Sequence, residues 1–219
     1  MKSEKKKPKK FKKKEKGKKR KKPTSPIGKA WDWIWHSDSI LSWIVALALA
    51  FIIVKFIFFP ILSFLLGTSL PLVVVESSSM EHPGSFLGNL FLTESSFDSW
   101  WQEKGDWYKE QGINKQTAET WPLKTGFDKG DIIIVSGRFN PIIGDVIIFN
   151  GNAKYPIIHR IIEVDEDTVA TKGDNNSGQL SSEKSIDKEE IIGKAVFRIP
   201  KVGWLKLFFV EVWKGFSGK

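Results

Sequence analysis

The longest apolar stretch of the chain runs from Ile40 to Phe59, and apolar residues continue after Pro60 as far as Leu66. A helix of this length, at about 1.5 Å per residue, matches the roughly 30 Å hydrocarbon core of a bilayer. The alternative is a secretory signal peptide, but its apolar region usually holds about 7 to 15 residues and ends at a small-residue cleavage site. The length and the missing cleavage site favour a single transmembrane helix.

Short runs rich in Val and Ile follow this helix, separated by Gly, Asn and Asp. The runs lie at 70–76, 131–137, 144–150, 156–164, 167–173 and 191–199. β-branched residues favour strands, and Gly, Asn and Asp favour the turns that join antiparallel strands. We therefore expect a mainly β fold, in which residues 68–83 and 127–200 form an antiparallel β domain behind an N-terminal transmembrane helix.

Residues 84–126 interrupt this strand pattern. Four aromatic residues in the segment SFDSWWQEKGDWYKEQ lie near one face of a helix, namely Phe97, Trp100, Trp101 and Tyr108. The pattern predicts a partly helical insertion, which we expect to be a cap-like subdomain over a cleft or a docking surface.

The basic charge of the chain is concentrated in its first 29 residues. These residues hold 16 of the 34 Lys and Arg and only two Glu, which gives them a net charge of +14. The rest of the chain carries −5, and the two parts sum to the net charge of +9. Such a segment has little to bury, and the positive-inside rule keeps it on the cytoplasmic side. Residues 1–29 are therefore expected to be a disordered cytoplasmic tail, and everything after about residue 67 is expected to lie outside the membrane.

Two further segments are expected at the membrane surface. Trp31, Trp33, Trp35 and Trp43 crowd the start of the apolar stretch, where indoles can lie between headgroups and hydrocarbon. Residues 30–67 are thus an interfacial segment followed by the transmembrane helix. Residues 201–219 are apolar with interspersed Lys and too short to span, which predicts an amphipathic membrane-surface tail.

The composition argues against metal chemistry. There is no Cys, so thiolate metal sites, disulfides and a cysteine nucleophile are excluded. His36, His82 and His159 are far apart in sequence and lack a metal-ligand spacing. We expect neither a metal nor a cofactor.

Three polar residues are candidates for chemistry. Ser79 ends a serine triplet that follows a strand-like run, although such a triplet alone is usually a turn. His159 lies in a strand, on the face opposite Ile158 and Arg160; it is either a packed histidine or a base that accepts a serine proton near neutral pH. Asp174 lies in a turn-forming Gly-Asp-Asn-Asn run and is the candidate to orient His159.

Taken together and in this order, five short motifs resemble type I signal peptidases of the archaeal and endoplasmic-reticulum branch. The motifs are VVVESSSMEHP at 73–83, GDVIIF at 144–149, IIHRI at 157–161, TKGDNN at 171–176 and GKA at 193–195. The resemblance implies a signal-peptidase-like antiparallel β catalytic domain. It also implies a membrane-bound serine endopeptidase that removes signal peptides from secreted preproteins at the outer membrane face.

The resemblance assigns roles to individual residues. Ser79, immediately before the methionine, is the nucleophile, and His159 is the general base where the bacterial branch has a lysine. Ser77 supports the oxyanion hole together with the backbone N–H of Ser79, and Met80 belongs to the same oxyanion and substrate-binding motif.

The acid that orients the base is the open question. Eukaryotic-type members carry a second aspartate six residues after the one in the GDNN motif, but this chain has Leu180 there. Asp174 takes the role by default, with Asp187 as the alternative acid and Glu183 or Asp165 as further candidates.

The expected partners are secreted preproteins, membrane lipids and, as a further candidate, a protein translocase, with no specific nucleic acid. The expected location is the cell membrane, with a single pass and an extracytoplasmic catalytic domain. The alternative function is a non-catalytic membrane-anchored scaffold or binding protein that uses the Lys-rich tail for lipid or nucleic-acid contact.

Overall fold

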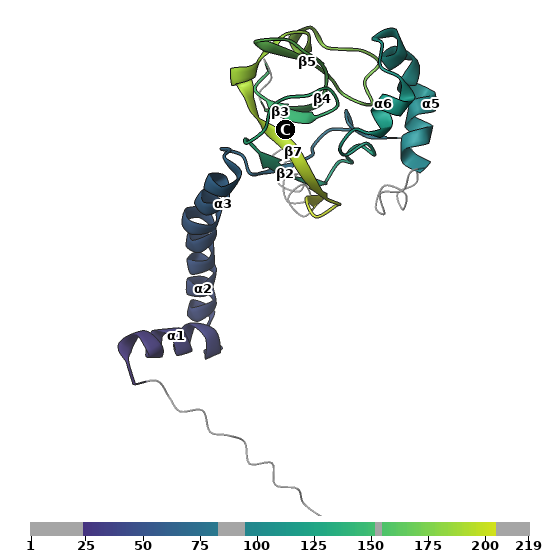
Figure 1. Cartoon of the computed structure of the whole chain (residues 1–219). Coiled ribbons are helices and arrows are strands. Elements are labelled where there is room, and N and C mark those ends of the chain that lie inside the picture. Colours follow the sequence, from purple (N-terminus) through teal and green to yellow (C-terminus); the bar gives the residue numbers. More distant parts are fainter. Residues whose placement is uncertain (1–23, 83–94, 152–154, 205–219) are drawn as a thin grey trace, which may run out of the picture. The chain divides into compact units, whose positions relative to one another are not determined.

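A computed structural model describes residues 24–82, 95–151 and 155–204 of the chain (Figure 1). The chain divides into two compact units, residues 1–54 and 55–219. Each unit is considered by itself. Our expectations for residues 1–23, 83–94 and 205–219 fall outside the described residues.

The first unit contains two helices, α1 (Pro26–His36) and α2 (Ile40–Ile53). Helix α1 includes the last four residues of the expected disordered tail, because Ser25 caps it by accepting a bond from the Gly28 backbone and Pro26 starts its first turn. Ile27, Trp31 and Trp35 recur on one exposed face of this helix.

The turn between α1 and α2 is closed by serine hydroxyls. The buried Ser42 hydroxyl donates to the carbonyl oxygens of Ser37 at 2.9 Å and Ser39 at 2.8 Å. Ser39 also caps α2 by accepting a bond from the Leu41 backbone. These contacts fix the path of the chain where the apolar helix begins.

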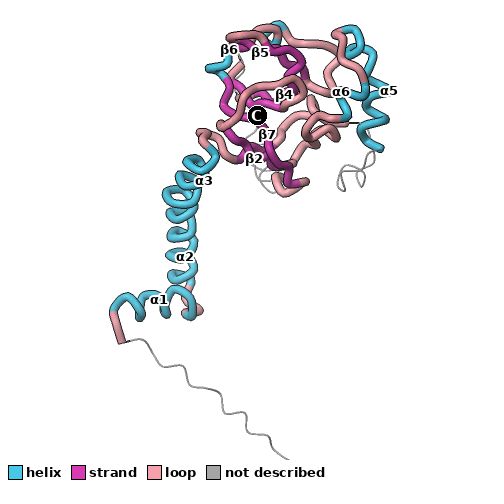
Figure 2. Tube along the Cα trace, viewed as in Figure 1, coloured by secondary structure: helices cyan, strands magenta, loops and turns pink. Residues whose placement is uncertain are grey.

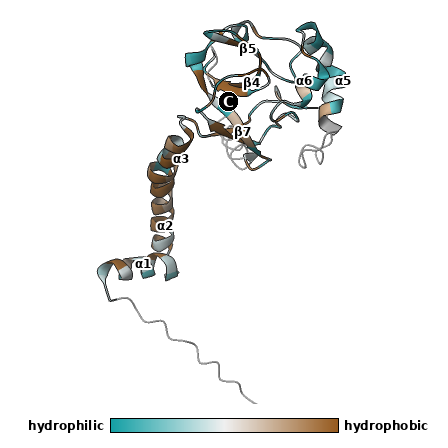
Figure 3. Cartoon of the chain, in the orientation of Figure 1, coloured by the Kyte–Doolittle hydropathy of each residue, from teal (hydrophilic) through white to brown (hydrophobic). Residues whose placement is uncertain are grey.

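The apolar helix runs without a break from Ile40 to Leu66 and is long and apolar enough to cross a membrane (Figure 3). A π-helical turn, η1 (Val54–Phe58), separates α2 from α3 (Phe59–Leu66). Pro60 explains this turn, because in a regular α-helix its ring would clash with the carbonyl of Phe56. The helix therefore continues past the proline to Leu66, where Gly67 ends it with a φ of +66°.

The second unit is built on one sheet of seven strands, every pair of which is antiparallel (Figure 2). Along the sheet the order is β1-β2-β7-β3-β4-β5-β6, so β1 and β6 are its edges. The strands are β1 (Leu72–Val74), β2 (Ile132–Ser136), β3 (Val146–Phe149), β4 (Ile157–Val164), β5 (Thr168–Lys172), β6 (Ile186–Asp187) and β7 (Ile191–Ile199). The expected mainly antiparallel β fold with an apolar N-terminal helix is confirmed.

Hydrogen bonds tie the end of α3 to the sheet. The carbonyl oxygen of Leu66 accepts the Gly137 N–H at 2.9 Å, and the Phe64 carbonyl accepts from the Arg138 guanidinium at 2.9 Å. The Thr68 hydroxyl donates to the Ile192 carbonyl in β7 at 2.9 Å. The last turn of the apolar helix is thus joined directly to the end of β2 and to β7.

The described part of the insertion forms α5 (Ser95–Glu110) and α6 (Lys115–Glu119). Its aromatic side chains pack in one buried cluster with Ile162 of β4 and Ala170 of β5. The helix predicted from the aromatic pattern is present within one residue at each end. The sequence pattern missed α6, β6 and the short 3₁₀ turns η2 (Ser181–Glu183) and η3 (Lys188–Glu190), because each is too short to show a period.

Candidate active site

A groove of about 680 Å³ lies beside the edge strand β1. One side is formed by β1 and the residues that follow it, and the other by the start of β4 and the loop after β5. Its lining residues are Leu70, Leu72–Val75, Glu76, Ser77, Ser79, Tyr155–Ile158, His159, Asn176 and Leu180. Ser79 and His159, which are 80 positions apart in sequence, thus line the same groove.

The loop that carries Ser79 is held by its backbone. The Ser79 carbonyl accepts the Asn175 N–H at 2.8 Å, and the Met80 carbonyl accepts the Phe127 N–H at 2.8 Å. The Ser79 hydroxyl lies 3.2 Å from the Ser77 hydroxyl and is partly exposed. These bonds leave the serine side chain at the groove while its main chain is fixed from behind.

Glu183 is the carboxylate that contacts His159. Its Oε1 atom is hydrogen-bonded to His159 Nδ1, and its Oε2 accepts the Leu180 N–H at 2.7 Å. The Thr171 hydroxyl donates to the same Oε1 at 3.4 Å. Glu183 is fully buried and His159 is 4% exposed, so the pair is shielded from water except at the groove.

Gly173 allows the histidine and the serine loop to approach each other. A Cβ atom at this position would lie 2.8 Å from His159 Nε2 and 2.9 Å from the Ser79 carbonyl oxygen. Both distances are shorter than ordinary contacts, so a side chain would displace the ring or the loop. Within the described residues, the Ser79 hydroxyl and the His159 ring share the groove without a direct hydrogen bond.

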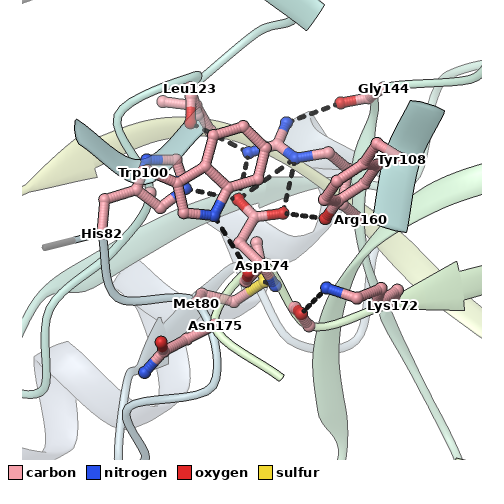
Figure 4. A network of polar contacts seen from close by, with 12 residues as sticks. Met80, His82, Trp100, Tyr108, Leu123, Gly144, Arg160, Lys172, Asp174 and Asn175 are labelled. Atoms are coloured by element: carbon pink, nitrogen blue, oxygen red, sulfur yellow. Dashed lines mark hydrogen bonds and ion pairs between the residues drawn. The ribbon is translucent and has the colours of Figure 1, made fainter. Parts of the chain in front are cut away.

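Asp174 is at the centre of a different network (Figure 4). Arg160 Nη2 donates to Asp174 Oδ2 at 2.7 Å and Arg160 Nε donates to Oδ1 at 2.9 Å. His82 Nε2 is bonded to Oδ2 at 2.9 Å, and the Tyr108 hydroxyl donates to Oδ1 at 3.3 Å. All of these side chains are buried. Asp174 therefore faces Arg160, and the contact with His159 that we expected of it is made by Glu183.

Charge and burial determine the protonation states in this network. Burial alone would raise the pKa of Asp174, but the charge of Arg160 and the hydrogen bonds from His82 and Arg160 hold that pKa well below its usual range. Burial lowers the pKa of His82 in spite of its bond to Asp174. His82 is thus neutral at neutral pH and donates its Nε2 proton to the carboxylate.

Three other predicted residues, Met80, Asp187 and Asp165, do not line the groove. Met80 is fully buried in the core beneath the sheet, where its sulfur accepts the Asp174 N–H at 3.4 Å, and it does not line the groove. Asp187 is exposed in β6, and Asp165 lies in the turn before β5, where its side chain accepts from Thr168. Among the described residues, no three His, Asp or Glu side chains come together as a metal site requires.

Comparison with curated proteins shows a relationship to signal peptidase complex catalytic subunits named SEC11 of Saccharomyces cerevisiae, for example from strains YJM789, RM11-1a and JAY291. Each is 31% identical over 103 residues, which cover 41% of this chain. The resemblance to type I signal peptidases of the endoplasmic-reticulum and archaeal branch is confirmed. The chain spans 61% of the length of these relatives, and no family model matches it.

Several residues of the Asp174 network and its surroundings were not predicted from the sequence. The sequence placed Trp100 and Tyr108 on the apolar face of a helix and gave them no role at the site. His82 was considered only as a metal ligand, and Lys172 only as part of the TKGDNN motif. The sequence does not indicate that a charged residue such as Lys172 is buried. That burial follows from the packing of α5 against β5, which no local pattern predicts.

Burial also makes the contribution of Lys172 to stability depend on pH. Its side chain is fully buried, donates to the Gly173 carbonyl at 3.0 Å and lies over the rings of Trp107 and Tyr108. Burial lowers the pKa of Lys172 from 10.5 to about 8, although the charge of Asp174 opposes the shift. Below pH 8 both the folded and unfolded states are protonated, so folding bears the full cost of burying the charge.

Between about pH 8 and 10.5 the unfolded state binds the extra proton, so this residue makes folding more favourable as pH rises. A shift of that size corresponds to about 3 kcal/mol. We predict that the free energy of unfolding of the wild type, relative to Lys172→Met, rises by about 2 to 3 kcal/mol from pH 7 to pH 10. Denaturant unfolding in detergent measures it, with the exposed Lys184→Met as the control. Parallel curves for wild type and Lys172→Met would contradict the assignment.

Proposed function

We propose that this chain is a membrane-bound serine endopeptidase that removes N-terminal signal peptides from secreted preproteins. The observation that carries the proposal is a single groove lined by both Ser79 and His159, with the buried Glu183 bonded to the far side of the imidazole. A nucleophile, a base and a group that orients the base are the three parts of a serine hydrolase triad. The relationship to signal peptidase catalytic subunits supplies the substrate class.

The reaction proceeds through an acyl-enzyme. Ser79 Oγ attacks the scissile carbonyl while His159 Nε2 takes its proton, and Glu183 stabilises the imidazolium through Nδ1. The imidazolium then gives the proton to the leaving amine as the C–N bond breaks, which leaves an ester on Ser79. Water, deprotonated by the same histidine, hydrolyses the ester. The hydrogen bond from Ser79 to the base forms when substrate occupies the groove, since such bonds often tighten only in the substrate complex.

The oxyanion of the tetrahedral intermediate is stabilised by the Ser79 N–H and the Ser77 hydroxyl. The Ser77 hydroxyl lies on the groove wall, 3.2 Å from the nucleophile oxygen. One such donor contributes about 3 to 4 kcal/mol in a serine protease. Ser77 is therefore assigned a role in the transition state, while Met80 supports the loop from the core.

The substrate binds as an added strand along β1. This strand is at the edge of the sheet and pairs on its inner side with β2, from Leu72↔Ile134 to Val74↔Ile132. An extended peptide can pair with the outer side of such a strand and place alternate side chains in the groove. Most of the groove wall is aliphatic, which suits the small apolar residues expected before the cleavage site.

We predict that Ser79→Ala lowers the rate of preprotein cleavage at least about 10³-fold, because the acyl-enzyme cannot form. The measurement is cleavage of a purified preprotein by the full chain in detergent or liposomes. Ser78→Ala is the matched control, since Ser78 is exposed and does not line the groove. This variant should cleave within about twofold of the wild-type rate. Equal cleavage by wild type and Ser79→Ala would leave a non-catalytic scaffold as the better hypothesis.

We predict that Glu183→Gln lowers kcat by about 10² to 10⁴-fold with a small change in KM, because the amide keeps its size but cannot stabilise the imidazolium. Asp187→Asn should leave kcat within about twofold, since Asp187 is exposed in β6. Steady-state kinetics on a fluorogenic signal-peptide substrate separates the two. Activity lost in Asp187→Asn but retained in Glu183→Gln would reverse the assignment of the acid.

The membrane arrangement belongs to the same proposal. The Lys-rich tail lies in the cytoplasm near anionic lipid, α1 lies at the interface through its tryptophans, and the sheet lies on the outer face. Anchoring enzyme and signal peptide in one bilayer raises their effective concentration. A translocase that delivers the preprotein is the candidate protein partner.

Single cysteines can test this orientation, because the natural chain has none. We predict that a membrane-impermeant maleimide labels Ser185→Cys in intact cells but labels Thr24→Cys only after permeabilisation. Both native side chains are exposed, so the reagent can reach either position. The reverse pattern of labelling would place the groove in the cytoplasm.

A further inference from the structure

One peptide group connects the inserted helix α5 to the nucleophile loop. The carbonyl oxygen of Asp174 accepts the indole Nε1–H of Trp100 at 2.9 Å. The N–H of the same peptide group, which belongs to Asn175, donates to the Ser79 carbonyl at 2.8 Å. Trp100, which lies against Asp174 in Figure 4, is therefore two hydrogen bonds from the main chain of the proposed nucleophile.

The orientation of this peptide group is set from both ends. A planar peptide has its C=O and N–H directed oppositely, so a donor fixed at the oxygen also fixes the direction of the N–H. Bonds in such a chain also polarise one another and strengthen. The Asn175 side chain adds a second bond, from Nδ2 to the Ser78 carbonyl at 3.1 Å, which holds the loop on the other side of the nucleophile.

Trp100 is itself held rigidly. Its ring is 1% exposed and stacks on His82, with ring centroids 4.4 Å apart and planes inclined by 2°. His82 is bonded in turn to the Asp174 carboxylate at 2.9 Å. One aromatic pair thus contacts both the side chain and the main chain of Asp174.

We infer that Trp100 is a positioning residue for the proposed peptidase, and that the described part of the insertion, residues 95–126, supports the loops behind the groove. Of the described residues between 95 and 126, none lines the groove. Trp100 acts through the Asp174–Asn175 peptide on the Ser79 main chain, whose N–H is the proposed oxyanion donor. The inference rests on the proposed function, because it assigns Trp100 to the same reaction.

The test compares Trp100→Phe with Trp101→Phe in the full-length protein. Both are buried tryptophans of α5 in the same aromatic cluster, but only Trp100 donates to Asp174. We expect Trp100→Phe to lower kcat about tenfold with KM within twofold, because substrate binding is retained while the oxyanion donor is misdirected. Trp101→Phe should retain kcat within about twofold at a similar loss of thermal stability.

A second substitution removes the donor without changing the packing. Replacing Trp100 by β-(benzothien-3-yl)alanine exchanges the indole N–H for sulfur and keeps the shape of the ring. The same loss of kcat is expected, with a smaller fall in melting temperature than Trp100→Phe, because the ring packing is kept while the buried Asp174 carbonyl loses its donor. Full kcat in this variant would overturn the inference even if Trp100→Phe failed to fold.

The wild type and Ser79→Ala are measured in the same assay. Equal rates for those two would refute the proposed function itself. Cleavage that depends on Ser79 but is unaffected by the benzothienyl substitution would refute only the role of Trp100. An equal fall of kcat in Trp101→Phe would likewise refute it, by showing a general effect of the cluster.

Discussion

The alternation of side chains along β4 is the constraint on which the site depends. Neighbouring residues of a strand point to opposite faces of a sheet, so His159 and Arg160 must serve different surroundings. His159 points toward the groove and Glu183, whereas Arg160 points toward Asp174 and the insertion. A carboxylate that pairs with Arg160 at 2.7 Å cannot also stand behind the histidine. Two acids are therefore needed, one for each face.

The buried pair of Arg160 and Asp174 costs solvation free energy, and its surroundings offset much of that cost. Arg160 also donates to three main-chain carbonyls, those of Pro122, Leu123 and Gly144. Removing one partner of a buried ion pair strongly destabilises a protein, because the other charge is left buried without a partner. Replacing both partners with apolar groups is often tolerated. The pair therefore contributes little to net stability. Its main effect is to fix the position at which β4, the GDNN loop and the insertion meet.

The sequence was informative where a pattern is local. Val and Ile runs indicate six of the seven strands, the length of the apolar stretch indicates the helix from Ile40 to Leu66, and strand alternation places His159 opposite Arg160. The partners of these residues could not be predicted in the same way. Which carboxylate contacts His159 depends on the tertiary path of the chain after β5, and neither a period nor a propensity encodes that path.

The same limit applies to the insertion. Four aromatics on one helix face predict a buried face, but they do not indicate what that face covers. In the structure the insertion covers Arg160 of β4 and Lys172 of β5. The Arg160 guanidinium lies over the ring of Trp121, and the Lys172 ammonium lies over the rings of Trp107 and Tyr108. Aromatic faces can stabilise such cations where water is excluded. An aromatic insertion is thus suited to covering the charged face of these strands.

The position of Glu183 explains how a carboxylate reaches His159 in a chain that has Leu180 where eukaryotic-type signal peptidases are expected to have an aspartate. Leu180 precedes the 3₁₀ turn η2, and Glu183 is the third residue of that turn. A glutamate at this position can fold back to the N–H of the residue before the turn, as in a capping box. Glu183 does so, accepting the Leu180 N–H at 2.7 Å through Oε2, which directs Oε1 to His159. The Glu183 side chain, starting three residues later, thus returns a carboxylate to the backbone N–H of Leu180.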